Sequence, residues 1–234
     1  MNFYVSIVTQ KKRKIALDKL LHSLPQEWKY IIIYQGENTD EFTIFDDGHI
    51  EVSLKNNIYN YGNWVGCNLL LTNNIIPKDS WFLFIHDTCR FLPGNNVIKT
   101  NNIIQKYHDT NIDILWLSNN GQNNICLIRR SGIAYGKRYG NIMEMSKKDA
   151  ILYECSHNHI LSPKCFNVNQ HFLDTPLLHL GKRYVYNNFT SYNVILFQSI
   201  NIEKYYRNKT LVSHSSTSEF NASTPNSSDG VSRV

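Results

Sequence analysis

The chain has 234 residues, of which 42% are hydrophobic, which is enough to fill a sizeable core and too much for a disordered protein. The formal net charge is +5, and the basic residues are scattered rather than gathered in one block, so nucleic acid is not an expected partner. A mildly basic balance suits an anionic ligand, such as a nucleotide diphosphate, or a membrane surface.

The cysteines and the apolar runs indicate where the protein is expected to work. Five cysteines, an odd number without a Cys-x-x-Cys pair, favour free thiols in a reducing compartment. The start MNFYVSIVTQKKRK lacks the layout of a secretory signal, and no apolar run approaches the roughly 18 residues of a transmembrane helix. We therefore expect a cytoplasmic protein, and its basic charge keeps peripheral membrane contact open.

Short apolar runs predict alternating strands and helices in the first part of the chain. A β-rich run, Phe3–Thr9, is followed by basic residues and by a helical pattern that ends at Pro25. A second apolar run, Trp28–Tyr34, then implies a βαβ unit with parallel strands. The segment Phe42–Val52 is expected to form short strand pieces around a turn.

The strongest strand signal lies in Trp81–Pro93, WFLFIHDTCRFLP. Its five leading apolar residues are typical of a central strand buried on both faces. Asp87 follows at the carboxyl end of this strand, where open α/β sheets bind their ligands. The preceding segment predicts a helix that opens at the Gly62-Asn63 turn and ends near Asn73.

The same patterns predict the elements that follow. These are a helix at Val97–His108, buried strands at Ile112–Leu117 and Ile125–Arg129, a helix at Ser146–Cys155, loops over Ser156–Gly181, paired strands at Tyr184–Phe189 and Tyr192–Phe197, and a short helix at Ile202–Arg207. Residues 213–234 should be a disordered polar tail, so one folded domain is expected over residues 1–212.

This order of elements resembles the nucleotide-diphospho-sugar glycosyltransferases of the GT-A fold, especially the family 2 type. In that family the apolar strand ends in Asp-x-Asp, which binds a divalent cation that bridges the donor's diphosphate. The resemblance covers Met1–Phe91 well and Asp113–Glu154 weakly. It implies an α/β fold, a Rossmann-like GT-A single domain with a mixed, mostly parallel central sheet flanked by helices.

The acidic motif reads His86-Asp87-Thr88 here, with one carboxylate where the family has two. The resemblance implies Mn²⁺ or Mg²⁺ on Asp87, because hard cations take oxygen ligands and keep waters and substrate phosphates. His86 would lie at the cofactor and donor site, and His157 and His159 are further candidate metal ligands. The alternative is that Asp87 caps a turn, that His86 is a core residue, and that the His-x-His pair belongs to a polar loop.

Other polar residues match the family's donor site. By the resemblance, the loops after the first two strands would contact the base or ribose, and the helix before the metal strand would supply a turn and an amide. These residues are Thr9, Gln10, Gln35, Glu37, Gly62 and Asn68. The alternative for the loop residues is that they are ordinary polar positions.

An inverting transferase needs a base for the acceptor hydroxyl, and a carboxylate is the usual choice. Asp149 is the first candidate and Glu154 the second, and the alternative is that each is an exposed helix carboxylate paired with Lys. The expected function is a hexosyltransferase-type glycosyltransferase that moves a sugar from a nucleotide-diphosphate donor to a glycan, lipid-linked or protein acceptor. The alternative function is a non-catalytic nucleotide-sugar or glycan-binding module on the same fold.

Overall fold

The computed structural model describes residues 2–117, 125–134, 146, 170–173, 177–184 and 191–207. Its strands are β1 (Asn2–Thr9), β2 (Lys29–Gln35), β3 (Glu41–Ile44), β4 (Ile50–Leu54), β5 (Ser80–His86), β6 (Cys89–Phe91), β7 (Ile114–Trp116), β8 (Cys126–Arg129), β9 (Gln170–Phe172), β10 (Leu177–Tyr184), β11 (Ser191–Phe197) and β12 (Ile202–Arg207). Its helices are the 3₁₀ turns η1 (Lys11–Arg13) and η2 (Tyr59–Tyr61) and the α-helices α1 (Lys14–Ser23), α2 (Gly62–Thr72), α3 (Asn96–His108) and α4 (Arg130–Ile133).

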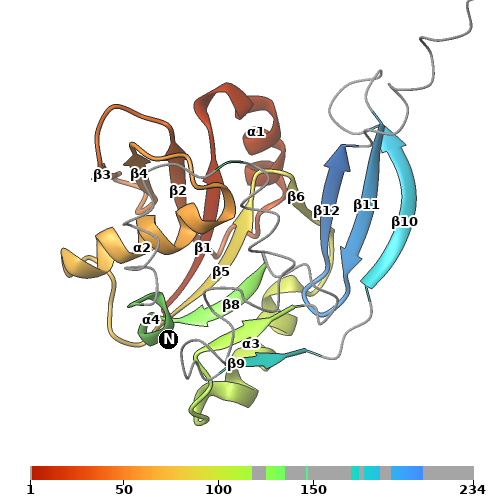
Figure 1. The fold of residues 1–234 in the computed structure, drawn as a ribbon. Helices are drawn as coiled ribbons and strands as arrows, with labels where there is room; N and C mark the ends of the chain where they lie inside the picture. Colours follow the sequence, from red (N-terminus) through yellow and green to blue (C-terminus); the bar gives the residue numbers. More distant parts are fainter. Residues whose placement is uncertain are drawn as a thin grey trace, which may run out of the picture.

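These strands form two sheets, which makes the described chain an α/β structure (Figure 1). The larger sheet has eight strands in the order β3-β4-β2-β1-β5-β8-β7-β9. Its centre is parallel, because β4, β2, β1 and β5 pair in the same direction, whereas β3 and β8 pair antiparallel to their neighbours. The sheet is therefore mixed and mostly parallel near its centre, as expected.

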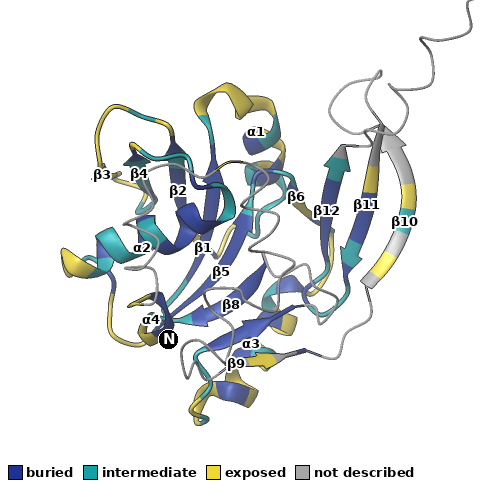
Figure 2. Ribbon diagram, in the orientation of Figure 1, coloured by how far each residue is buried: buried dark blue, intermediate teal, exposed yellow. Residues whose placement is uncertain are grey.

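Helices cover both faces of the large sheet, and the apolar residues of the central strands alternate between two cores. On one face, α2 packs on the core that contains Tyr4, Val8 and Phe84. On the other face, α1 and α3 pack on the core that contains Val5 and Ile85. Figure 2 shows the central strands as buried, whereas exposed residues lie on the outer sides of the helices. This two-sided burial is the reason why β5 has an unbroken apolar sequence.

The chain reverses its direction of winding beside β1. From β1 it passes through α1 to β2, which lies on one side of β1, and later returns through α2 to β5, which lies on the other side. The two crossover helices lie on opposite faces, so the carboxyl ends of β1 and β5 lie between them at one edge of the sheet. In open α/β sheets such a switch point is where ligands bind.

The smaller sheet is antiparallel and has the order β10-β11-β12-β6. Its strand β11 confirms the predicted strand Tyr192–Phe197, and its pairing with a preceding strand was also expected. The expected helix at Ile202–Arg207 is wrong, because this segment is β12 and pairs with β11 and β6. The expected loop up to Gly181 is also wrong in part, because β9 and most of β10 lie within it. In Figure 1 this sheet stands beside the large one, and β6 joins it directly after the end of β5.

Several expectations fall on residues that the structure does not describe. The predicted helix Ser146–Cys155 lies outside the described residues except for Ser146, and so does the predicted tail 213–234. The segment 185–189 of the predicted strand Tyr184–Phe189 lies outside them as well. In the described part of the chain, none of the helices has the length and apolar character needed to cross a membrane.

Candidate functional site

The carboxyl ends of β1 and β5 bring together predicted site residues that are far apart in the sequence. The two strands are parallel neighbours, with Val8 opposite His86. The backbone N–H of Asp87 donates to the Val8 carbonyl at 3.3 Å, which extends the pairing one step beyond β5. As a result Thr9 and Asp87, 78 positions apart, are in direct contact.

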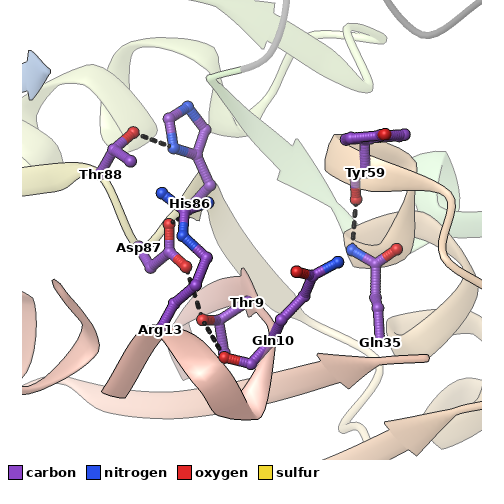
Figure 3. Close-up of polar contacts among 8 residues, drawn as sticks. All are labelled: Thr9, Gln10, Arg13, Gln35, Tyr59, His86, Asp87 and Thr88. Carbon is purple, nitrogen blue, oxygen red and sulfur yellow. Dashed lines mark hydrogen bonds and ion pairs between the residues drawn. The ribbon is translucent and has the colours of Figure 1, made fainter. Parts of the chain in front are cut away.

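Asp87 is fully buried, with 0% of its surface exposed. The Thr9 hydroxyl donates a hydrogen bond to Oδ2 at 2.6 Å, and Nη1 of Arg13 lies 3.0 Å from Oδ1 (Figure 3). The Arg13 contact is an ion pair without hydrogen-bond alignment, since Oδ1 has no hydrogen-bond partner among the described residues. Burial raises the pKa of Asp87, and the Arg13 charge and the Thr9 hydrogen bond oppose this shift.

Arg13 reaches Asp87 from the turn that joins β1 to α1. The turn η1 is closed by a hydrogen bond from the Arg13 backbone N–H to the Gln10 carbonyl at 2.8 Å. The Arg13 side chain is 44% exposed, so its guanidinium group contacts a buried carboxylate on one side and solvent on the other. Its position at the carboxyl edge of the sheet makes it available to a ligand at the switch point.

His86 is partly buried and points to the other side of the strand end from Asp87 (Figure 3). Its Nδ1 lies 2.5 Å from the hydroxyl of Thr88, two residues further along the chain. Burial lowers the pKa of His86 well below its usual value, and the positive charges of Lys204 and Arg13 lower it further. The imidazole is therefore neutral at pH 7.

Lys204 comes to this site from the smaller sheet. It lies on β12, is 1% exposed, and is paired in register with Cys89 of β6. The backbone N–H of the next residue, Tyr205, donates to the Thr88 carbonyl at 2.9 Å, which fixes β12 beside the His86-Asp87-Thr88 turn. A buried ammonium group thus lies within electrostatic range of His86.

Helix α2 supports the site through Asn63. The Asn63 side chain is 1% exposed and donates to the Ile85 carbonyl at 2.8 Å. Its Oδ1 accepts a hydrogen bond from the Ser6 hydroxyl at 2.9 Å. One amide therefore joins β1 and β5 just before their functional ends. Asn68, which was predicted instead, lies about 7.5 Å further along the helix axis and is only half-buried.

Gln35 and Gly62 hold the loop that precedes α2. The Gln35 side chain accepts from the backbone N–H of Ile58 at 2.6 Å and donates to the Tyr59 carbonyl at 2.5 Å. A Cβ at Gly62 would lie 2.7 Å from Nε2 of Gln35, so glycine is required for this close approach. These contacts give both residues a structural role, and their contact with a nucleotide stays a prediction.

The remaining predicted residues of the two polar loops lie at the same edge of the sheet. Glu37 forms an ion pair with Lys11 at 2.6 Å, and Lys11 is mostly exposed. Gln10 is half-buried, and its backbone carbonyl closes the η1 turn. The predicted catalytic residues Asp149 and Glu154 and the predicted metal ligands His157 and His159 lie outside the described residues.

The described part of the site does not fit a divalent cation. Mg²⁺ and Ca²⁺ bind oxygens at about 2.0–2.6 Å and require several oxygen ligands. Both Asp87 oxygens already face a hydroxyl or a guanidinium group, and Nδ1 of His86 faces Thr88. Among the described residues, no three His, Cys, Asp or Glu side chains gather closely enough to hold a metal ion.

One cavity of the described residues lies outside this site. It has a volume of about 910 Å³ and runs between α1 and the turn from β6 to α3, with Ile15, His22, Phe91 and Val97 among its lining residues. Neither Asp87 nor Arg13 lines it. We assign the functional site to the strand ends nevertheless, because the buried charges lie there and a large volume by itself indicates no chemistry.

Three residues of this site were not singled out from the sequence. Arg13 belongs to the basic run that directly follows β1. Its position after a strand was the only feature of the sequence that could have indicated a site residue. Asn63 adjoins the predicted Gly62 turn, so only its burial distinguishes it from Asn68. Lys204 carried no signal, because its segment was predicted as a helix.

Comparison with known proteins does not assign the chain to a family. No protein-family model matches it, and no curated protein matches it significantly.

Proposed function

We propose that the chain is a glycosyltransferase that transfers a sugar from a nucleotide-diphosphate donor to a glycan, lipid-linked or protein acceptor, on a Rossmann-like GT-A domain. The observation that carries this proposal is the contact of Thr9, Arg13 and Asp87 at the switch point between β1 and β5. An open α/β sheet binds its ligand at this position. Asp87 lies where the resembled family places its conserved acidic motif.

The charges at this edge support a phosphate-bearing ligand. Arg13 is a cation at the strand ends and is partly open to solvent, and the buried Lys204 of β12 lies within electrostatic range of His86. Arg and Lys are the side chains that bind phosphate oxygens most effectively, through charge-assisted hydrogen bonds. Thr9, Gln10 and Glu37 then remain the proposed neighbours of the base and ribose, and Asp149 and Glu154 the proposed catalytic carboxylates.

One observation favours a second function, a nucleotide-sugar or glycan-binding module without turnover. The carboxylate of Asp87 is already engaged by Thr9 and Arg13, and no other carboxylate of the described residues contacts this group. A site without a free carboxylate binds a donor but has no base for the acceptor. The two functions differ in product formation and agree in donor binding.

A thermal-shift panel of nucleotide sugars, with and without Mn²⁺, tests both functions. A ligand at about one hundred times its Kd adds about 2.7 kcal/mol to the free energy of unfolding, which is roughly 5–10 °C in Tm for a domain of this size. A sugar donor that raises Tm is then incubated with acceptors, and release of the nucleoside diphosphate is measured. Binding with transfer supports the transferase, binding without transfer supports the module, and no Tm shift from any donor refutes both.

The variant Asp87→Asn links the measurement to the site. Asn keeps an oxygen that accepts from Thr9 but loses the charge that holds Arg13, so the fold should survive while transfer falls at least about tenfold. The matched control is Asp109→Asn, which changes an exposed carboxylate at the end of α3. Equal transfer by both variants would exclude Asp87 from the site.

A further inference from the structure

A group of positive side chains lies at the edge of the large sheet where β5 begins, opposite to the edge that carries Asp87. Its members are Lys78, which precedes β5, and Arg129 and Arg130, at the end of β8 and the start of α4. We propose that these three side chains bind a phosphate group. Because β5 has seven residues and a strand rises about 3.3 Å per residue, this place lies roughly 20 Å along the strand from the proposed donor site. The inference therefore goes beyond the proposed function and does not depend on it.

A small cavity brings the three cations together. It has a volume of about 200 Å³, and its lining includes Lys78, Arg129 and Arg130 together with Ser80, Trp81 and Ser131. Pockets for drug-sized ligands measure roughly 300–1,000 Å³. This cavity therefore suits one small group, such as a phosphate group, rather than a whole nucleotide sugar.

Arg129 is held in the cavity wall by partners that carry no charge. It lies opposite Trp81 in the pairing of β5 with β8, and its guanidinium carbon is 4.9 Å from the centre of the Trp81 ring. Its Nη2 donates to the carbonyls of Tyr107 and His108. These contacts fix the position of the guanidinium group and leave its charge without a carboxylate partner among the described residues. A cation that is already ordered loses little conformational freedom when an anion binds.

Arg130 and Lys78 add two further cations without partners. Arg130 is half-buried, and it forms neither an ion pair nor a side-chain hydrogen bond with any described residue. The Nε atoms of Arg129 and Arg130 are both buried without a hydrogen-bond partner in the described part of the chain. Lys78 is exposed and is likewise not ion-paired there. An anion in the cavity would compensate the charge of two guanidinium groups that have already lost part of their hydration.

The charge balance around the cavity is positive. One carboxylate lines it, that of the exposed Asp79, and Asp79 is not ion-paired with any of the residues that the structure describes. The nearby carboxylate of Asp113 accepts a hydrogen bond from the Ser131 hydroxyl. Three cations against one lining carboxylate favour an anion with more than one negative charge. A phosphate monoester has this charge, and its oxygens accept charge-assisted hydrogen bonds from Arg and Lys.

The test is a titration of the isotope-labelled full chain with inorganic phosphate, followed by nuclear magnetic resonance. We expect saturable shifts of the backbone N–H signals of Ser80 and Ser131 and of the Trp81 indole N–H, because these residues line the cavity. A dissociation constant of about 1 mM or lower is expected for a small anion bound by three cations. The ionic strength is kept constant with sodium chloride, so that binding is separated from screening of surface charge.

Variants assign the binding to the three cations. Arg130→Met and Lys78→Met should each weaken phosphate binding about fivefold or more, since each removes charge-assisted hydrogen bonds. Arg130→Lys keeps the charge and should retain more affinity than Arg130→Met. Lys55→Met, at an exposed residue that follows β4, is the matched control and should change the affinity less than about twofold. The Tm of each variant is measured first, and the exposed position of Lys78 keeps the test valid if Arg130→Met weakens the fold.

Two arms distinguish the sources of the phosphate group. Vesicles of phosphatidylcholine and phosphatidic acid are compared with phosphatidylcholine alone in a sedimentation assay. Vesicle binding that is lost in Arg130→Met and kept in Lys55→Met identifies a lipid headgroup, whereas saturable binding of inorganic phosphate without vesicle binding identifies a soluble phosphate compound.

Three results would overturn the inference. They are the absence of saturable shifts around the cavity, an equal loss of affinity in Lys55→Met and Lys78→Met, and shifts confined to the residues around Arg13 and Asp87. The further variant Arg13→Met should leave the shifts of Ser80 and Ser131 unchanged, because it alters only the proposed donor site. Failure of the nucleotide-sugar panel would refute the proposed function and leave this anion site standing.

Discussion

Replacement of Asn63 by Ala tests whether α2 determines the position of the functional strand ends. The change removes the hydrogen bond to the Ile85 carbonyl at 2.8 Å and the hydrogen bond from Ser6 at 2.9 Å. Each buried hydrogen bond contributes about 0.5–1.5 kcal/mol, and the Ser6 hydroxyl keeps a second partner in the Cys67 sulfur at 3.3 Å. Alanine recovers roughly 0.5 kcal/mol of helix propensity. Adding the small cavity left by the amide, we expect a loss of about 2 kcal/mol.

The matched control is Asn68→Ala, a half-buried residue of the same helix whose Oδ1 has no hydrogen-bond partner among the described residues. Its expected change is within about 0.5 kcal/mol. Urea denaturation followed by circular dichroism measures both free energies of unfolding, and equal slopes against urea confirm that the two-state comparison is valid. If Asn68→Ala costs as much as Asn63→Ala, the assignment of the supporting amide to Asn63 is refuted.

Two further predictions concern His86 and Gly66. Because burial, Lys204 and Arg13 lower the native pKa of His86 below 6.5, its contribution to stability is complete above pH 6.5 and is lost as the pH falls through the native pKa. In His86→Gln the decline in Tm on acidification below pH 6.5 should therefore be shallower, and an unchanged decline would contradict the assignment. A Cβ at Gly66 would lie 2.6 Å from Cδ1 of the fully buried Ile33, so Gly66→Ala should cost about 1–3 kcal/mol of overpacking against about 1 kcal/mol of helix propensity. Ile33→Val removes the clashing atom, and the double variant should be more stable than the sum of the single changes predicts.

The sequence was most informative where local pattern and burial agree. The strand Trp81–Ile85 is apolar without interruption because helices cover both faces of its sheet, and it was predicted as a central strand with a carboxylate at its end. The βαβ unit of β1, α1 and β2 was predicted correctly for the same reason. The spacing of apolar residues indicates how many faces of a strand are buried, and in these central strands both faces are buried.

The smaller sheet was predicted only in part: β11 was expected as a strand, whereas β12 was expected as a helix, and β6 was missed because its partner β12 is distant in the sequence. The segment Ile202–Arg207 contains Glu and Lys beside aromatic residues, a composition that permits a helix, and only pairing with β11 and β6 makes it a strand. In β10 the register shifts between His179 and Lys182, and Gly181 has φ +76°. A glycine within a strand is typical of a loop when only the sequence is considered. The strand was therefore predicted to begin at Tyr184, later in the chain than β10 begins.

Asp87 has two opposing effects on an anion at the proposed donor site, and the unfavourable effect is the larger. Without Asp87, the guanidinium group of Arg13 would lose its ion pair at the strand ends. With it, the ion pair fixes Arg13 and saves about 0.5–1.5 kcal/mol of side-chain ordering when the ligand binds. A unit charge about 6 Å from the ligand, at an effective dielectric constant of about 20, opposes the anion by about 3 kcal/mol. The carboxylate therefore lowers the affinity for an anion while it fixes the position of Arg13. This distinguishes it from a metal ligand, because removal of a metal ligand can only weaken binding.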